Sequence, residues 1–174
     1  WPVGDGPVYV DTLEEKARSL GAEIYFTTTA NELIQDENGR VTGVVATYKD
    51  GATYTFKADK GVIMTTGGFS ANVEMREAVN TMWPSLDANV PNTNSPAITG
   101  DGIVMAQAIG ADVVDMDAIQ LYPVNNPATG NYYYIDYARL NSTALLVNKE
   151  GKRFVNEKGT RDVISLATLE QTDK

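Results

Sequence analysis

The chain has 174 residues, enough for one domain or two small ones. Its 23 acidic residues outnumber its 14 basic ones, and a net charge of -9 without a basic stripe predicts no nucleic-acid partner. The absence of cysteine excludes disulfides and thiolate catalysis, and the absence of histidine removes the usual general base and the commonest metal ligand. We therefore expect no metal site, and chemistry that depends on Asp, Glu, Arg, Lys, Tyr, the backbone or a cofactor.

Apolar runs in the sequence are far shorter than the roughly 18 residues that a membrane-spanning helix needs, so no membrane span is predicted. The chain opens with Trp-Pro-Val-Gly instead of an initiator Met. This predicts that it is processed or is a piece of a longer protein. Composition does not indicate a compartment, because the lack of cysteine fits any of them.

The first third of the sequence predicts one helix and a small sheet. Residues 8–20 alternate apolar and charged side chains at helical spacing, and Gly21 is a typical residue to end that helix. The predicted strands are residues 23–26, 31–35, 41–48 and 53–58. Because their connections at residues 36–39 and 49–51 are rich in Asp, Asn and Gly, the last three strands are expected to form an antiparallel meander.

The remainder is less regular. Residues 61–65 read as a buried strand, and an Asn- and Pro-rich loop is expected at residues 86–96. Helices are predicted at residues 70–82 and 103–109 and from residue 161 onward, extended segments at 111–117 and 119–122, and a hairpin of strands 145–147 and 153–155.

Three clusters of residues are candidates for chemistry. Thr65–Gly68 follow the predicted strand, and their small side chains allow close approach of a ligand, although an ordinary turn explains them equally well. Thr99–Gly102 stand at a helix start, where capping by Thr99 or Asp101 is the alternative. Arg153 and the pair Arg161-Asp162 could hold a carboxylate or form salt bridges within the chain.

Four motifs, taken in order, resemble one family. They are GVIMTTGGF at residues 61–69 followed by Asn72 and Glu74-Met75, TGDGIVMA at 99–106, IQLYP at 119–123, and LVNKEGKRFVNE at 146–157 followed by Thr160-Arg161-Asp162. Together they resemble the fumarate reductase and succinate dehydrogenase flavoprotein family, over nearly the whole chain from residue 8 to residue 165.

The resemblance implies an α+β chain in two parts. Residues 1–70 would be part of an FAD-binding domain, a β-meander plus a strand, and residues 71–174 would be an α+β cap domain that covers the substrate. FAD would carry the redox chemistry, with a hydride passing from the reduced flavin to the C=C bond of a 2-enoate. The implied flavin contacts are Ala30, Thr66, Gly67, Gly68 and Asp101.

Arg161 occupies the place of the arginine that delivers the proton in this family. The residue type alone would not suggest that role, because arginine usually binds carboxylates instead of donating protons. The implied substrate-binding residues are Tyr122, Asp136, Tyr137 and Arg139. Arg153, by contrast, is expected to make a structural ion pair.

Two departures from the family pattern bear on the substrate. Tyr122 stands where fumarate reductases of this type have His. In DYARL at residues 136–140 the family's Glu falls on Tyr137 and its Arg on Leu140, one place from Arg139. A Tyr at the first position is similar to urocanate reductases, so we expect a 2-enoate other than fumarate.

Other functional elements of the family would lie outside this sequence. These are the glycine-rich phosphate loop, a second catalytic His, a second substrate-binding Arg and an electron donor, which could be an FMN-binding or haem domain. The isolated chain is therefore not expected to retain FAD tightly or to turn over. Two other functions remain open: a ketosteroid dehydrogenase-like flavoprotein and a folded, non-catalytic binding domain.

Overall fold

The computed structural model describes residues 5–124, 126 and 139–171, and it divides the chain into two compact units, 1–63 and 64–174. We treat each unit by itself. This division lies seven residues before the boundary expected at residue 70, and the assignment of the units to flavin and cap domains stays a prediction. In the part of the chain that is described, no helix is both long and apolar enough to cross a membrane.

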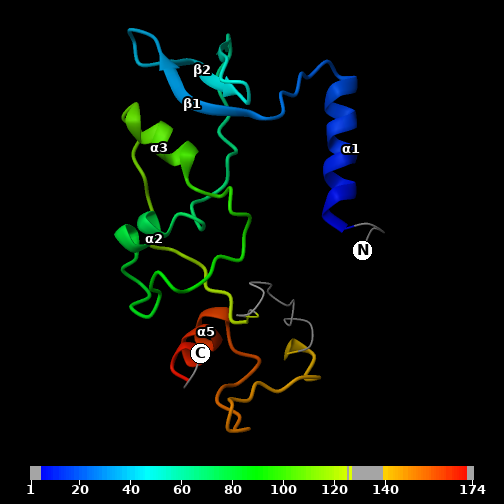
Figure 1. Ribbon diagram of the computed structural model, residues 1–174, viewed down its shortest axis with the longest axis vertical. Helices are drawn as coiled ribbons and strands as arrows, with labels where there is room; N and C mark the ends of the chain where they lie inside the picture. The colour runs from blue at the N-terminus through cyan, green and yellow to red at the C-terminus, as the bar shows by residue number, and fades with distance from the viewer. Residues whose placement is uncertain (1–4, 125, 127–138, 172–174) are drawn as a thin grey trace. The chain divides into compact units, whose positions relative to one another are not determined.

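The first unit consists of one helix and one sheet (Figure 1). Helix α1 covers Asp5–Ser19, and strands β1 (Thr28–Gln35), β2 (Val41–Tyr48) and β3 (Thr53–Lys57) form an antiparallel sheet in the order β1-β2-β3. The predicted meander is confirmed. Its first turn forms because the Asp36 carboxylate accepts hydrogen bonds from the amides of Asn38 and Arg40, both at 2.9 Å.

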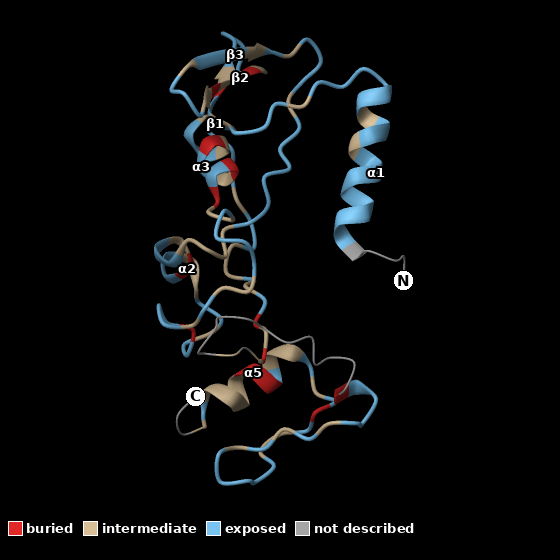
Figure 2. Cartoon of the chain, turned by 45° about the vertical axis from the view of Figure 1, so that its right-hand side comes forward, coloured by how far each residue is buried: buried red, intermediate tan, exposed pale blue. Residues whose placement is uncertain are grey.

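Two details of this sheet differ from simple expectation. Residues 23–26 are not a strand; β1 starts only at Thr28, after Thr27 with its positive φ of 51°. Pairing also shifts between Ala30 and Glu32, so Asn31 is the extra residue of a β-bulge. The burial map in Figure 2 shows buried positions on β1 and β2, where Leu33 and Ala46 form the small core, whereas α1 is mostly exposed.

The second unit has short helices joined by long irregular segments (Figure 1). They are α2 (Val73–Val79), α3 (Asp101–Ala108) and α5 (Arg161–Leu169). Helix α2 is shorter than the predicted span, because Asn72 caps its start and Asn80 ends it with a side chain that donates to the Trp83 carbonyl. Among the described residues of this unit, the buried apolar side chains are Leu86, Met105, Leu121 and Ile164.

One predicted strand, which spans the boundary between the units, is wrong. Residues 61–65 pair with no strand among the described residues and Ile63 is 87% exposed, so they are not a buried strand. Residues 111–117 and 119–122, predicted as extended segments, belong to no sheet, and residues 116–117 form a turn. The predicted hairpin is reduced to one bridge, Val147 with Arg153, because the Leu146 amide donates to the Glu157 carboxylate at 3.0 Å instead of to a strand.

Candidate active site

The stretch expected to pass the flavin is open to solvent. Thr66, Gly67 and Gly68 are exposed and irregular, and Gly67 has a positive φ of 80°. A Cβ added at Gly68 would meet no atom within 4 Å, and one added at Gly67 would meet only the Ile98 side chain. The predicted turn is therefore present, and its surface can accept a ligand close to the backbone.

Helix α3 packs directly on this stretch. A Cβ on Gly102 would collide with Thr66 Oγ1 and lie 2.7 Å from Met64 Sδ, and one on Gly100 would lie 2.8 Å from Met75 Sδ. Close packing within the unit thus accounts for both glycines. Capping by Thr99 or Asp101 was a wrong alternative, because Gly100 is the N-cap and no side chain caps the helix. Asp101 is exposed and accepts a hydrogen bond from Thr99 Oγ1 at 2.8 Å.

Arg161 is the first residue of α5 and is half-buried. Its guanidinium carbon lies 5.2 Å from the centre of the Tyr122 ring, a cation–π contact, and its Nη1 donates to Gln120 Oε1 at 3.3 Å. On the next residue, a hydrogen bond from the Thr160 hydroxyl lowers the pKa of Asp162. The structure therefore brings together the predicted acid and the predicted specificity residue, which are far apart in sequence.

Arg161 and Tyr122 line a cavity of about 470 Å³. The lining also includes Phe69 and Ser70, which directly follow the glycine stretch, and Arg76. Arg76 is only 6% exposed; its two Nη atoms each donate to the Val90 carbonyl at 3.1 Å, and its Nε has no partner. The volume and the mix of apolar and polar groups lie within the range of small-molecule sites.

The wall that carries Tyr122 is held by hydrogen bonds from the segment after α2. Trp83 Nε1 donates to the Ile119 carbonyl at 2.6 Å, and Thr81 Oγ1 donates to the Asp117 carboxylate at 2.6 Å. These bonds replace the ladder that a strand would have had. They fix the irregular segment from which Gln120 and Tyr122 extend.

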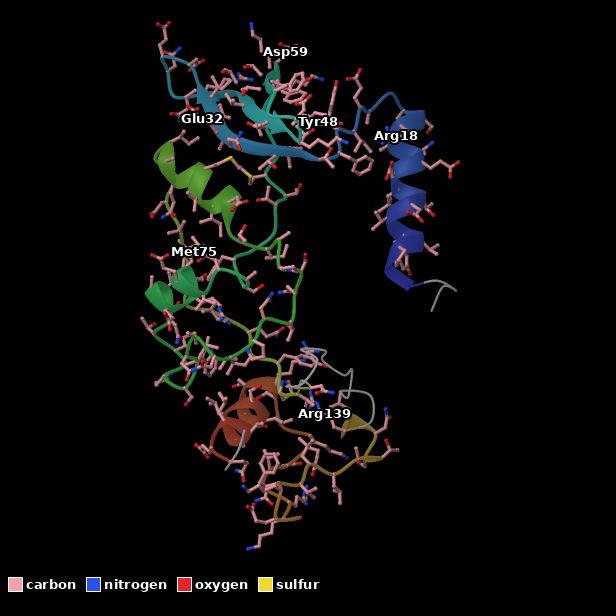
Figure 3. The ribbon with its side chains drawn as sticks, in the orientation of Figure 1. Arg18, Glu32, Tyr48, Asp59, Met75 and Arg139 are labelled. Carbon is pink, nitrogen blue, oxygen red and sulfur yellow. The ribbon has the colours of Figure 1, made fainter. Side chains whose placement is uncertain are left out.

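The remaining predicted site residues lie in different places, and none of them is among the described residues that line the cavity. Arg139 is 4% exposed, and its Nη1 donates to the carbonyls of Glu157 and Gly159 (Figure 3). Arg153 makes the predicted ion pair, with Nη2 2.6 Å from the Glu157 carboxylate. Asp136 and Tyr137 lie outside the described residues, and Ala30 belongs to the first unit, beside the bulge of β1.

Glu157 has an unusual electrostatic environment. Hydrogen bonds from the Arg153 guanidinium, and then from the Leu146 amide, lower the pKa of this carboxyl from 4.5 to about 2. The same contact raises the pKa of Arg153. Both groups are therefore charged across the whole range in which an enzyme normally works.

The profile of the family described as "FAD binding domain" matches residues 2–174. The chain belongs to this family. It is 44% identical over 171 residues to a urocanate reductase of Eggerthella lenta, a match that covers 97% of this chain and 28% of the relative. The chain thus spans less than a third of that relative's length.

Two solved structures share the fold. The open conformation of a flavocytochrome c3 fumarate reductase superposes with a TM-score of 0.77 at 32% identity, covering 96% of this chain and 28% of the other. A 3-ketosteroid-Δ4-(5α)-dehydrogenase from Rhodococcus jostii gives a TM-score of 0.66 at 33% identity, covering 92% and 30%. The chain is thus part of a flavoprotein of the fumarate and urocanate reductase family, as its motifs predicted.

The second unit offers surfaces that fit such a cofactor. Thr66 and Gly67 line a further hollow of about 250 Å³ together with Ile103, Ala106 and Val113. Small residues combined with apolar side chains suit a flat, partly apolar group. Among the described residues no group of three or more acidic side chains could hold a metal ion.

Gln120 and Arg76 line the cavity but were not among the residues predicted from the sequence. Gln120 is two positions before Tyr122, so in an extended segment both side chains lie on the same face, and this spacing could have identified it. Arg76 carries no comparable signal, because a single Arg in a helix is usually a surface residue.

Proposed function

We propose that the protein carrying this chain reduces the C=C bond of a 2-enoate, with bound FAD supplying the hydride. The proposal rests mainly on one observation: Arg161 contacts the Tyr122 ring on the wall of a cavity of about 470 Å³. The identity to a urocanate reductase and the fold shared with a fumarate reductase support it. Because the chain spans only 28% of each, activity and substrate are inferences about the whole protein.

In this proposal Arg161 holds the proton that is transferred to the α-carbon of the substrate. Its position at the start of α5, its hydrogen bond to Gln120 and its contact with Tyr122 fix the guanidinium at the cavity wall. A fixed donor can be aligned with the carbon that it protonates, which a freely rotating surface arginine cannot. Arg76 provides a second positive group along the same cavity, which favours an anionic substrate.

Tyr122 is proposed to select the substrate. It offers a neutral hydroxyl and an aromatic edge where fumarate reductases have an imidazole. A site of this kind favours an acid whose far end is flat and less charged than a second carboxylate. Urocanate fits this description better than fumarate does.

The other roles follow from the resemblance and complete the proposal. Ala30, Thr66–Gly68 and Asp101 would contact FAD, Asp136 and Tyr137 would contact the substrate, and the second unit would be the cap domain. The electron donor, an FMN-binding or haem domain or protein, would lie outside this chain.

A steroid dehydrogenase is the second candidate, because the Rhodococcus structure shares the fold at nearly the same identity. That function requires a largely apolar cavity. The cavity here contains Arg76, Arg161, Asn94 and Gln120, which favours a small acid over a steroid.

The test is an assay of the full-length protein with a reduced viologen as donor and urocanate, fumarate, acrylate and a 3-ketosteroid as substrates. Urocanate or another 2-enoate should be reduced faster than fumarate. Arg161→Lys keeps the charge but loses the planar fork, and should lower kcat by about 10²–10⁴-fold, the usual contribution of a general acid. Arg40→Lys, which changes the residue just before β2 in the first unit, serves as the control and should leave kcat unchanged.

Tyr122→His should shift the preference toward fumarate in the same assay. Near-normal turnover of Arg161→Lys, or a wild-type preference for fumarate or for the steroid, would contradict the proposal.

A further inference from the structure

The turn that precedes Arg161 is held by a buried arginine. Arg139 is 4% exposed, and its Nη1 donates to two carbonyls, those of Glu157 at 2.8 Å and Gly159 at 2.9 Å (Figure 3). The turn is closed by the Gly159 amide, which donates to the Asn156 carbonyl at 2.9 Å. One nitrogen thus fixes the chain at two points, the second only two residues before Arg161.

The side chain of the same turn is fixed independently. The Glu157 carboxylate accepts from Arg153 Nε and Nη2 and from the Leu146 amide. On the other side of Arg161, helix α5 is anchored by Ile164, which is fully buried. The backbone of Arg161 therefore lies between two restrained points, from which its side chain reaches the cavity.

We propose that Arg139 is a positioning residue, which places the Arg161 guanidinium in the cavity through the carbonyls of Glu157 and Gly159. This rests on the proposed function of Arg161. The described residues that line the cavity do not include Arg139, and the nitrogen that makes these bonds is directed at the backbone. Because a displacement of about 1 Å at a reacting group can cost on the order of 10²-fold in rate, a loosened turn should appear in kcat.

The pair of carbonyl bonds gives the proposal a sharp test. Since Nη1 alone makes both of these bonds, the ammonium of Arg139→Lys can replace this pair, with three donors on a slightly shorter chain. Arg139→Met has similar bulk and no donor. A residue that instead clamped a substrate carboxylate with its planar fork would not be rescued by Lys.

The first unit provides a matched control. Arg40 Nη2 donates to the carbonyls of Asp59 at 3.0 Å and Lys60 at 2.9 Å, the same arrangement of one nitrogen on two nearby carbonyls. Neither Asp59 nor Lys60 lines the cavity of about 470 Å³, and neither belongs to the turn before Arg161. Arg40→Met therefore reports the general effect of losing such a bond pair.

The experiment compares these variants in the full-length, flavin-loaded protein by steady-state kinetics with the preferred enoate and by hydrogen–deuterium exchange of peptides spanning residues 156–163. For Arg139→Met we expect kcat lower by about 10²-fold with KM changed by no more than about twofold. Exchange in these peptides should be faster by about 10-fold or more, as loss of hydrogen bonds to a charged group implies. Arg139→Lys should recover most of both, and Arg40→Met should change neither.

Several results would overturn the proposal. One is a raised KM at unchanged kcat in both Arg139 variants, which would make the residue a substrate ligand. Another is unaltered exchange at residues 156–163 in Arg139→Met. If Arg139→Met does not fold, Arg139→Gln, which is neutral and too short to reach the carbonyls, takes its place with the same expectations. If the wild type reduces no enoate, the proposed function fails, and the exchange comparison alone then decides whether Arg139 holds the turn.

Discussion

The two units are stabilised in different ways. In the first, backbone ladders join β1, β2 and β3, and the exposed side chains of the sheet belong to β1 and β3. In the described part of the second, short helices are connected by segments that side chains hold to the backbone, as Arg139, Trp83 and Arg76 do. The ladder keeps its shape under most substitutions. In the second unit the same side chains stabilise the fold and shape the cavity, so stability and chemistry are coupled there.

The largest expected effect is at the centre of the second unit. Ile164→Ala removes the fully buried side chain of α5 and should lower the free energy of unfolding by about 2–5 kcal/mol, because the cavity it leaves is closed on all sides. The neighbouring Val163 is 50% exposed, so Val163→Ala should cost about 0.5 kcal/mol. Urea denaturation measures both. Equal costs would show that α5 is not packed as described.

Two glycine-to-alanine substitutions, one in each unit, should change the stability of the protein in opposite directions. Gly102→Ala places a methyl group against Thr66 Oγ1 and Met64 Sδ and should destabilise the protein by about 1–3 kcal/mol. Gly6, in α1, has no atom within 4 Å of an added Cβ, so Gly6→Ala should stabilise by up to about 1 kcal/mol through helix propensity. Thermal unfolding followed by circular dichroism would measure the two shifts. A gain from Gly102→Ala would refute the tight packing of α3.

Acid should loosen the second unit through Glu157. Its pKa of about 2 lies below the ordinary 4.5, so the stability it contributes is complete above about pH 4.5 and is lost as the pH falls toward about 2. Glu157→Gln should make unfolding less steeply dependent on pH in that window. The cost at neutral pH should be smaller than that of Gly102→Ala, because Arg153 is 54% exposed and can turn to water. Denaturation curves from pH 7 to pH 3 provide the measurement, and identical pH slopes for the two proteins would contradict it.

The smallest effect is expected in α1. Arg18 forms an exposed ion pair with Glu14 at 2.8 Å, four residues earlier on the same helix. Arg18→Ala should cost about 0.3–0.5 kcal/mol, and the difference should shrink in 1 M salt because exposed charges are screened. Denaturation at low and high salt tests this, and a cost above 1 kcal/mol would show that the pair does more than contribute surface charge.

The sequence was sufficient for the parts that are specified locally. The meander follows from turn residues such as Asp36 and Gly39, whose hydrogen bonds stay within a few positions, and α5 starts at Arg161 as its pattern predicts. Strands at residues 23–26 and 61–65 were wrong because a strand needs a partner, and no local pattern shows whether one is available.

For the site, family motifs identified Arg161 and Tyr122, but not what surrounds them. The hydrogen bond from Arg161 to Gln120 joins positions 41 residues apart, and Arg139 was expected to contact substrate although its Nη1 is directed at carbonyls. Such contacts depend on how loops fold onto one another. Sequence spacing carries little of that information.

The supports of Tyr122 and of Arg161 are separate. Trp83 and Thr81 hold the segment that leads to Tyr122, whereas Arg139 holds the turn that leads to Arg161. Substitutions of the tyrosine can therefore leave the turn before Arg161 in place, although they remove the cation–π contact with its guanidinium. Under the proposed function, such an arrangement would let a lineage exchange one acid for another while the turn that carries its proton donor is kept, and it tells an engineer to randomise the chain around Tyr122 and to leave Arg139 alone.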